Sequence, residues 1–105
     1  MIKRGEVWLT RLDPTVGHEL QKTRPCLVVS PEDFTPYDLL MIVPLTTGAR
    51  PAPYRLPVRF DDRGGFLLPE QIRTVSRRRM VKRLGELDAA SVSLVLGILR
   101  EMFEA

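Results

Sequence analysis

Short runs in which apolar and polar residues alternate fill most of the chain, and they predict a sheet of short strands. The stretches with this pattern are 6–12, 26–29, 39–45, 54–60, 66–68 continued by 72–75, and 82–87. Pro57 limits the fourth stretch to an edge or bulged position, because proline cannot donate a hydrogen bond to a neighbouring strand. Pro69 interrupts the fifth stretch, and residues 61–65 predict the turn that precedes it.

The pattern changes to a helical period near the C-terminus. Asp88 is a favourable N-cap and apolar residues recur at helical spacing after it, so a helix is expected over 89–103. Leu94 and Ile98 lie beside the main apolar stripe and give the helix more apolar surface than one small sheet covers. The surplus favours a dimer partner, with a helix sunk deep into its own barrel as the alternative. Together these elements predict a mainly β (α+β) fold, a strongly bent antiparallel sheet closed by one terminal helix.

A long polar segment separates the first two predicted strands. Residues 17–25 read Gly-His-Glu-Leu-Gln-Lys-Thr-Arg-Pro, whereas a simple hairpin needs only about two to five residues. Its side chains can exchange protons or bind phosphate, and connections of this kind are usually functional. The first candidate site is therefore this segment, with His18, Glu19, Lys22 and Arg24 as its ionisable residues.

The positive charge of the chain is concentrated, although the net charge is only +3. Between Arg73 and Arg83 the chain carries six cations and no acid, whereas acids gather elsewhere, as at Asp61 and Asp62. Such clustering is typical of a protein that binds a polyanion. A solvated basic edge that discourages aggregation between strands is the alternative.

Length and composition favour one compact cytoplasmic domain. With 105 residues, 44% of them hydrophobic, the chain is expected to form a single domain over 1–105. The lone Cys26 excludes a disulfide within the chain and is expected to be a buried packing residue in a reducing compartment. The sequence shows neither a signal-peptide pattern nor an apolar stretch long enough to span a bilayer, so a soluble protein without membrane contact is expected.

Five motifs follow one another across nearly the whole chain. They are Arg-Gly-Glu-Val-Trp at 4–8, Leu-Asp-Pro-Thr-Val-Gly-His-Glu at 12–19, Thr-Arg-Pro-Cys-Leu-Val-Val-Ser-Pro at 23–31, Val-Pro-Leu-Thr-Thr at 43–47 and Glu-Gln-Ile-Arg-Thr-Val at 70–75. This series resembles the MazF/PemK/Kid toxin endoribonucleases, with the spacing preserved. The combination is far more specific than any single motif.

The resemblance implies a fold, an activity and partners. The implied fold is an SH3-like small barrel with a C-terminal helix, the PemK/CcdB-like toxin fold, assembled as a homodimer. The implied activity is that of a type II toxin, a metal-independent endoribonuclease that cuts single-stranded RNA such as mRNA at short sequences. A co-encoded antitoxin neutralises it, and we expect that antitoxin to be acidic and partly apolar because it must compete with RNA for the cations.

Cutting RNA without a metal requires the 2′-OH to attack the adjacent phosphorus, which needs a base, an acid and a cation. Arg24 is the best candidate for the cation, because a guanidinium offers a planar fork of donors that matches phosphate oxygens. Thr46 follows the third predicted strand, where its hydroxyl can donate to the same phosphate. The resemblance makes Thr46 the catalytic partner of Arg24.

His18 and Glu70 complete the expected catalytic set, each with an alternative. His18 corresponds to a proposed active-site histidine of the Kid-type branch and is otherwise an inert loop residue; imidazole suits proton transfer at neutral pH. Glu70 sits where that branch places a catalytic acid and could accept the 2′-OH proton, or is simply an exposed glutamate. Two residues earlier that branch has an arginine and this chain has Leu68, so the arrangement of Arg24 with Thr46 is favoured.

Further polar residues of these motifs and of the basic segment are expected to bind RNA, namely Glu19, Lys22, Thr47, Gln71, Arg73, Arg77 and Arg78. Lys22, Arg73 and the cations at 77–83 are expected to line one groove with Arg24. Arg73 is also a candidate for the positive charge that Leu68 does not supply. Glu19 is a candidate either for the chemistry or for the structural support of Arg24.

Other functions have less support in the residues. One histidine and one cysteine cannot form a structural zinc site within a monomer, and the chain has no phosphate-binding glycine loop, so no metal or nucleotide cofactor is expected. A CcdB-like gyrase poison or another non-enzymatic binding module on the same fold is the second hypothesis. The phosphate-binding Arg24 and Thr46 favour the endoribonuclease.

Overall fold

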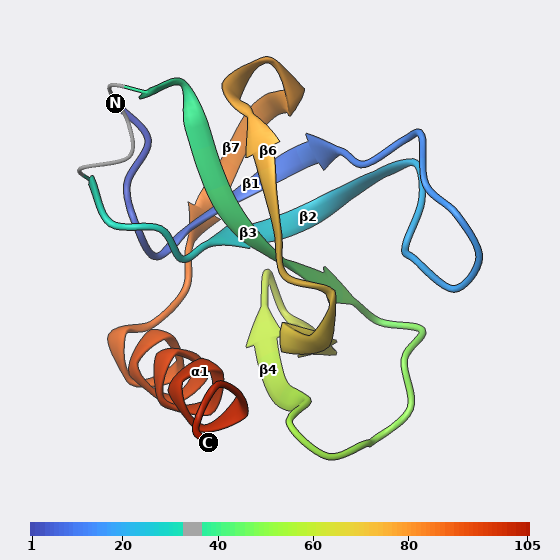
Figure 1. Cartoon of the computed structure of the whole chain (residues 1–105), viewed down its shortest axis with the longest axis vertical. Coiled ribbons are helices and arrows are strands. Elements are labelled where there is room, and N and C mark those ends of the chain that lie inside the picture. The colour runs from blue at the N-terminus through green and yellow to red at the C-terminus, as the bar shows by residue number, and fades with distance from the viewer. Residues whose placement is uncertain (33–36) are drawn as a thin grey trace.

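Seven strands in one antiparallel sheet make up most of the structure (Figure 1). The computed structural model describes residues 1–32 and 37–105. The strands are β1 (Glu6–Arg11), β2 (Thr23–Val28), β3 (Leu39–Thr46), β4 (Leu56–Phe60), β5 (Arg63–Leu67), β6 (Arg73–Ser76) and β7 (Met80–Glu86). Two 3-10 turns, η2 (Pro69–Gln71) and η3 (Arg77–Arg79), flank β6, and the helix α1 (Ala89–Met102) follows β7.

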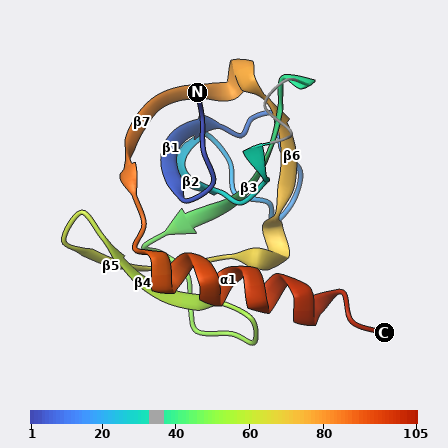
Figure 2. The same cartoon turned by 90° about the vertical axis from the view of Figure 1, so that its left-hand side faces the viewer.

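The central strand β3 changes partner along its length. Across the sheet the strands are ordered β4-β5-β3-β2-β1-β7, and β6 pairs with β3 off this path. The segment of β3 from Leu39 to Ile42 pairs with β6, whereas Leu45 and Thr46 pair with β5. Figure 2 shows the resulting curl, in which β7, β1, β2, β3 and β6 follow a ring with α1 and the β4–β5 hairpin beside it. The predicted strongly bent antiparallel sheet with one terminal helix is confirmed.

Two corrections concern the chain between β4 and β6. The predicted fifth strand is in fact the separate strands β5 and β6, because Pro69 begins η2 and redirects the chain from one end of β3 to the other. The turn before β5 is also shorter than expected. Asp61 and Asp62 alone form it, with φ of 53° and 61°. Aspartate tolerates this left-handed region, and two such residues make the turn that matches the twist of a hairpin.

A third correction matters for the site, because β2 begins at Thr23 and not at Cys26. Arg24 pairs with Thr10 of β1, and Pro25 pairs with Leu9. The polar side chains at the start of β2 hid this pairing in the sequence. Arg24 therefore projects from a strand of the sheet and not from the loop that precedes it.

Apolar clusters lie on both faces of the sheet, because alternate residues of a strand point to opposite sides. Along β2, Leu27 belongs to the first cluster, whereas Cys26 and Val28 belong to the second. The helix covers the first cluster with Val95 and Leu99. Burial raises the pKa of the Cys26 thiol to about 12. The predicted packing role of this cysteine is thus confirmed, since its thiolate is strongly disfavoured.

The helix was predicted closely. Asp88 is its N-cap, and its carboxylate accepts hydrogen bonds from the Ser91 backbone N–H at 3.0 Å and the Ser91 hydroxyl at 2.9 Å. These hydrogen bonds hold the pKa of Asp88 below its usual value. Leu94 and Phe103 are 58% and 76% exposed, so apolar surface remains uncovered beside α1. In the described residues, no helix is both long and apolar enough to cross a membrane.

Candidate active site

The start of β2 and the end of β3 lie side by side and open into a groove. The antiparallel register that pairs Cys26 with Pro44 places Arg24 opposite Thr46. We call this hollow of about 610 Å³ the Arg24 groove. Its lining residues are His18, Leu20, Arg24, Thr46, Thr47, Gly48, Ala49, Arg50, Arg55, Leu68 and Gln71. The structure thus brings together His18, Arg24 and Thr46, three of the four residues predicted to be catalytic.

Arg24 is half-buried and carries an uncompensated charge. Its Nε donates to the Gln21 carbonyl oxygen at 3.2 Å, which orients the guanidinium from the preceding loop. No carboxylate of the described residues forms a salt bridge with it. The outer nitrogens can therefore donate to an anion in the groove, as a phosphate-binding arginine must.

Thr46 is buried at the end of β3, with its side-chain oxygen turned toward the next loop. Thr46 Oγ1 accepts a hydrogen bond from the Gly48 N–H at 3.2 Å, which leaves the hydroxyl proton for another acceptor. The neighbouring β5 approaches unusually closely, because a Cβ at Gly65 would lie 2.8 Å from the Thr46 carbonyl oxygen. Gly65 is therefore required for the close packing that fixes this end of β3.

Gln71 fixes the loop between β1 and β2 against η2. Its Oε1 accepts from the Leu20 N–H at 2.8 Å, and its Nε2 donates to the His18 carbonyl oxygen at 3.3 Å. Within the loop, Glu19 Oε1 accepts from the Val16 N–H at 2.7 Å. These contacts give Gln71 and Glu19 structural roles in the loop, and the support expected from Glu19 goes to Val16 and not to Arg24. The imidazole of His18 is exposed at the groove.

Glu70, the fourth predicted catalytic residue, is paired with a cation that the sequence analysis did not identify. Its Oε2 lies 2.7 Å from both Nε and Nη2 of Arg55. Arg55 Nη1 also donates to the Arg50 carbonyl oxygen at 2.9 Å. Glu70 itself borders a smaller neighbouring hollow with Glu19 and Arg73, whereas Arg55 lines the Arg24 groove.

Arg50 and Arg55 are therefore the functional candidates that the sequence analysis missed. Both belong to the loop between β3 and β4, which contains three prolines and two arginines directly after Thr46 and Thr47. Cations in a loop that leaves a predicted catalytic threonine were the available signal. Their distance from Arg24 along the chain hid the fact that the fold brings them into one groove.

The expectation that one groove collects all the cations is wrong. Arg73 Nη1 donates to the Leu12 carbonyl oxygen at 3.0 Å, in the smaller hollow beside Glu70. Lys22 is exposed in the loop with a φ of 66°. Arg77 and Arg78 lie in η3, beyond the far end of β6 and at the top of Figure 1. The curl of the sheet separates them from Arg24, and their RNA contacts stay a prediction.

Comparison with known proteins adds three similarities. The family model described as "PemK-like, MazF-like toxin of type II toxin-antitoxin system" matches residues 3–103. Endoribonuclease PemK of Escherichia coli is 40% identical over 105 residues, covering 91% of this chain and 77% of that protein.

Two solved structures share the fold. The crystal structure of MazF from Deinococcus radiodurans has a TM-score of 0.85 at 26% identity and covers 96% of this chain and 94% of that chain. A mycobacterial endoribonuclease in complex with its cognate antitoxin has a TM-score of 0.79 at 22% identity, with 96% and 93% covered. The first of these likenesses, at 94% of the MazF chain, includes the strands that carry Arg24 and Thr46 here.

Proposed function

This chain belongs to the family of PemK-like, MazF-like toxins of type II toxin–antitoxin systems, and we propose that it is the toxin of such a system, an endoribonuclease that cuts single-stranded mRNA and so inhibits translation and growth. The observation that carries the proposal is the convergence of Arg24, Thr46 and His18 on one groove. Both the 40% identical relative and the groove chemistry favour RNA cleavage over a CcdB-like gyrase poison.

The proposed reaction is attack of the ribose 2′-OH on the adjacent phosphorus, with departure of the 5′-oxygen. The products are a 2′,3′-cyclic phosphate and a 5′-OH end, and the step needs no metal or cofactor. Arg24 stabilises the negative charge that develops on the phosphoryl oxygens, because its guanidinium carries no carboxylate partner. The Thr46 hydroxyl donates a further hydrogen bond to the same phosphoryl group.

His18 is the proposed proton-transfer residue. It is exposed in the Arg24 groove on a loop that Gln71 holds in place, and neutral imidazole can accept the 2′-OH proton. Glu70 is assigned a different role from the base expected from the sequence. Because both of its contacts at 2.7 Å go to Arg55, it positions that guanidinium at the groove wall.

The decisive experiment is cleavage of a long single-stranded RNA by the purified protein in excess chelator. The expected result is a set of fragments with 2′,3′-cyclic phosphate ends, which terminal analysis identifies. Intact RNA with a correctly folded protein would contradict the proposal. Cleavage that chelator abolishes would retain the nuclease but exclude the metal-independent mechanism.

Two partners are part of the proposal. The first is a co-encoded acidic antitoxin that competes with RNA for the groove cations and is itself ordered on binding. High salt should slow its association more than its release, because long-range attraction is screened. Since mRNA is the substrate, the proposed location of both proteins is the cytoplasm.

The second partner is another copy of this chain. Leu94 and Phe103 leave large apolar side chains exposed beside α1, and a symmetric homodimer would cover them. Light scattering at micromolar concentration is expected to show twice the 12.0 kDa chain mass. A stable monomer at that concentration would contradict the dimer without affecting the proposed chemistry.

A further inference from the structure

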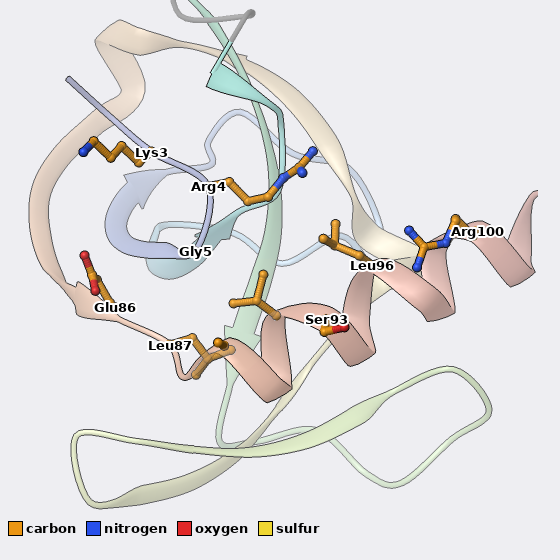
Figure 3. Close-up of a pocket in the computed structure, with 10 residues that line it drawn as sticks. Lys3, Arg4, Gly5, Glu86, Leu87, Ser93, Leu96 and Arg100 are labelled. Atoms are coloured by element: carbon orange, nitrogen blue, oxygen red, sulfur yellow. The ribbon is translucent and has the colours of Figure 1, made fainter.

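A second groove lies between the N-terminal segment and the helix, and we call it the α1 groove (Figure 3). Its volume is about 500 Å³. Lys3, Arg4 and Gly5 form one wall, and the helix face that carries Val92, Ser93, Leu96 and Arg100 forms the other. The lining residues of the α1 groove and of the Arg24 groove do not overlap.

The walls of the α1 groove are fixed by backbone hydrogen bonds. The Gly5 N–H donates to the Val28 carbonyl oxygen at 2.9 Å, and the Gly5 carbonyl oxygen accepts from the Leu87 N–H at 2.9 Å. Gly5 has a φ of 94°, which favours glycine, and a Cβ there would lie 3.6 Å from Val92. The groove is therefore preformed, which lowers the entropic cost of filling it.

One end of the groove combines positive charge with an aliphatic surface. Figure 3 shows the side chains of Arg4 and Arg100 at this end, close to Leu96. Arg4 Nε donates to the Val29 carbonyl oxygen at 2.9 Å, which orients its guanidinium. Within the described residues neither arginine forms a salt bridge. A carboxylate placed between them would therefore meet two uncompensated cations.

The floor favours a peptide over RNA. It is formed by the aliphatic side chains of Leu87, Val92 and Leu96, and none of the lining residues is aromatic. Single-stranded nucleic acids bind through base stacking on aromatic rings as well as through phosphate contacts, and this floor provides no ring. An apolar peptide side chain beside a carboxylate fits both the floor and its cations.

We propose that the α1 groove is a docking site for an acidic, partly apolar segment of the antitoxin, separate from the site where RNA is cut. A carboxylate of that segment lies between Arg4 and Arg100, and an aliphatic side chain packs on Val92 and Leu96. This inference rests on the proposed toxin function for the identity of its partner. It assigns the anchoring of the antitoxin to one groove and the exclusion of RNA to the other.

The test measures the affinity of the full-length chain for the purified acidic protein encoded by the neighbouring reading frame. Ser93→Trp fills the exposed middle of the groove, and Arg100→Glu reverses a charge that makes no hydrogen bond within the described residues. Each is expected to weaken binding about tenfold or more, because a clash or a repelled carboxylate removes the anchor. Lys82→Glu, an equal charge reversal at an exposed position of β7, is the matched control and should bind normally.

The RNA cleavage rate, measured without the antitoxin, separates the two proposals. Wild-type cleavage by Ser93→Trp and Arg100→Glu with weakened antitoxin binding supports a separate docking site. Unchanged affinity in both variants would overturn the α1 groove, as would a conversion to monomers, which would make it an interface between copies. A neighbouring frame that encodes no acidic protein would also overturn it, whereas loss of cleavage in the wild type would overturn only the proposed function.

Discussion

Glu6 and Glu70 each pair with an arginine, but in opposite settings. The Glu6 side chain is 9% exposed, and its carboxylate accepts from the Lys3 N–H, the Trp8 indole and Arg83 at 3.0–3.1 Å. The Glu70 side chain is 36% exposed, and its printed contacts all go to Arg55. The first carboxylate joins elements that are far apart in the sequence, whereas the second holds one guanidinium at the edge of a groove.

The difference lies in what each pair positions. Arg83 also reaches Glu86 at 3.0 Å, so the Glu6 cluster fastens β7 to β1. Removing such a buried acceptor leaves several donors without partners, and the loss appears in stability. Arg55 instead faces the Arg24 groove, where a displaced cation would alter a reaction rate while the core stays intact.

The largest expected effect lies in the groove, at the arginine that has no carboxylate partner. Arg24→Ala is expected to reduce the RNA cleavage rate by about 10²–10³, the usual cost of losing a donor to a developing oxyanion. Arg24→Lys should also fail, because a point charge does not reproduce the guanidinium fork. Single-turnover cleavage measures the rate, and thermal unfolding should be unchanged. Near-wild-type cleavage by a folded Arg24→Ala protein would exclude this assignment.

The next effect lies in the Glu6 cluster and appears in stability. Glu6→Ala is expected to lower the free energy of unfolding by about 1.5–3 kcal/mol, because the hydrogen bonds to this charged acceptor are lost. Urea denaturation measures the change, and the cleavage rate per folded molecule should stay normal. Glu86→Ala, at the exposed partner of the same arginine, is the control and should change stability by about 0.5 kcal/mol or less. Equal effects of the two substitutions would refute the special role of Glu6.

The Arg55–Glu70 pair is expected to give a smaller effect on the rate. If Glu70 acts by positioning Arg55, then Arg55→Met and Glu70→Gln should each slow cleavage about tenfold, and the double variant should be no slower than Arg55→Met. A double-mutant cycle on the cleavage rate tests this coupling. Additive losses, with Glu70→Gln far more damaging than Arg55→Met, would restore Glu70 as the general base.

The contrast between the two pairs also shows what the sequence could predict. Alternation and helical spacing predicted β1, β3, β7 and α1 closely, because a buried face leaves a periodic pattern. Motif spacing identified Arg24, Thr46 and His18, which the fold brings to one groove. The start of β2 was missed because its polar side chains at Thr23 and Arg24 face away from the core.

Contacts between distant segments left no comparable signal. Arg55 and Glu70 are 15 residues apart, and Glu6 and Arg83 are 77 residues apart. Which arginine meets which carboxylate depends on the curl of the sheet and on the point at which β3 exchanges one partner for another. The same curl carries the basic residues of η3 away from the groove, which the run of cations alone could not indicate.

The smallest expected effect is a pH dependence of stability that originates at Glu6. Burial disfavours its carboxylate, but hydrogen bonds from Lys3, Trp8 and Arg83 outweigh this and hold the pKa of Glu6 below its usual value. A lowered pKa in the folded state means that the ionised group stabilises the fold above the pKa of the unfolded state, and that this contribution is lost as pH falls through the lowered value.

Thermal unfolding of the wild type and of Glu6→Gln over the acidic range measures this contribution. The wild type should exceed the variant by a constant amount near neutral pH, and the gap should close as Glu6 is protonated in the folded state. Asp88, whose pKa is also lowered, titrates in both proteins and cancels in the comparison. A gap that stays constant down to the lowest pH at which both proteins fold would mean that the Glu6 cluster stabilises the protein through packing and not through its charge.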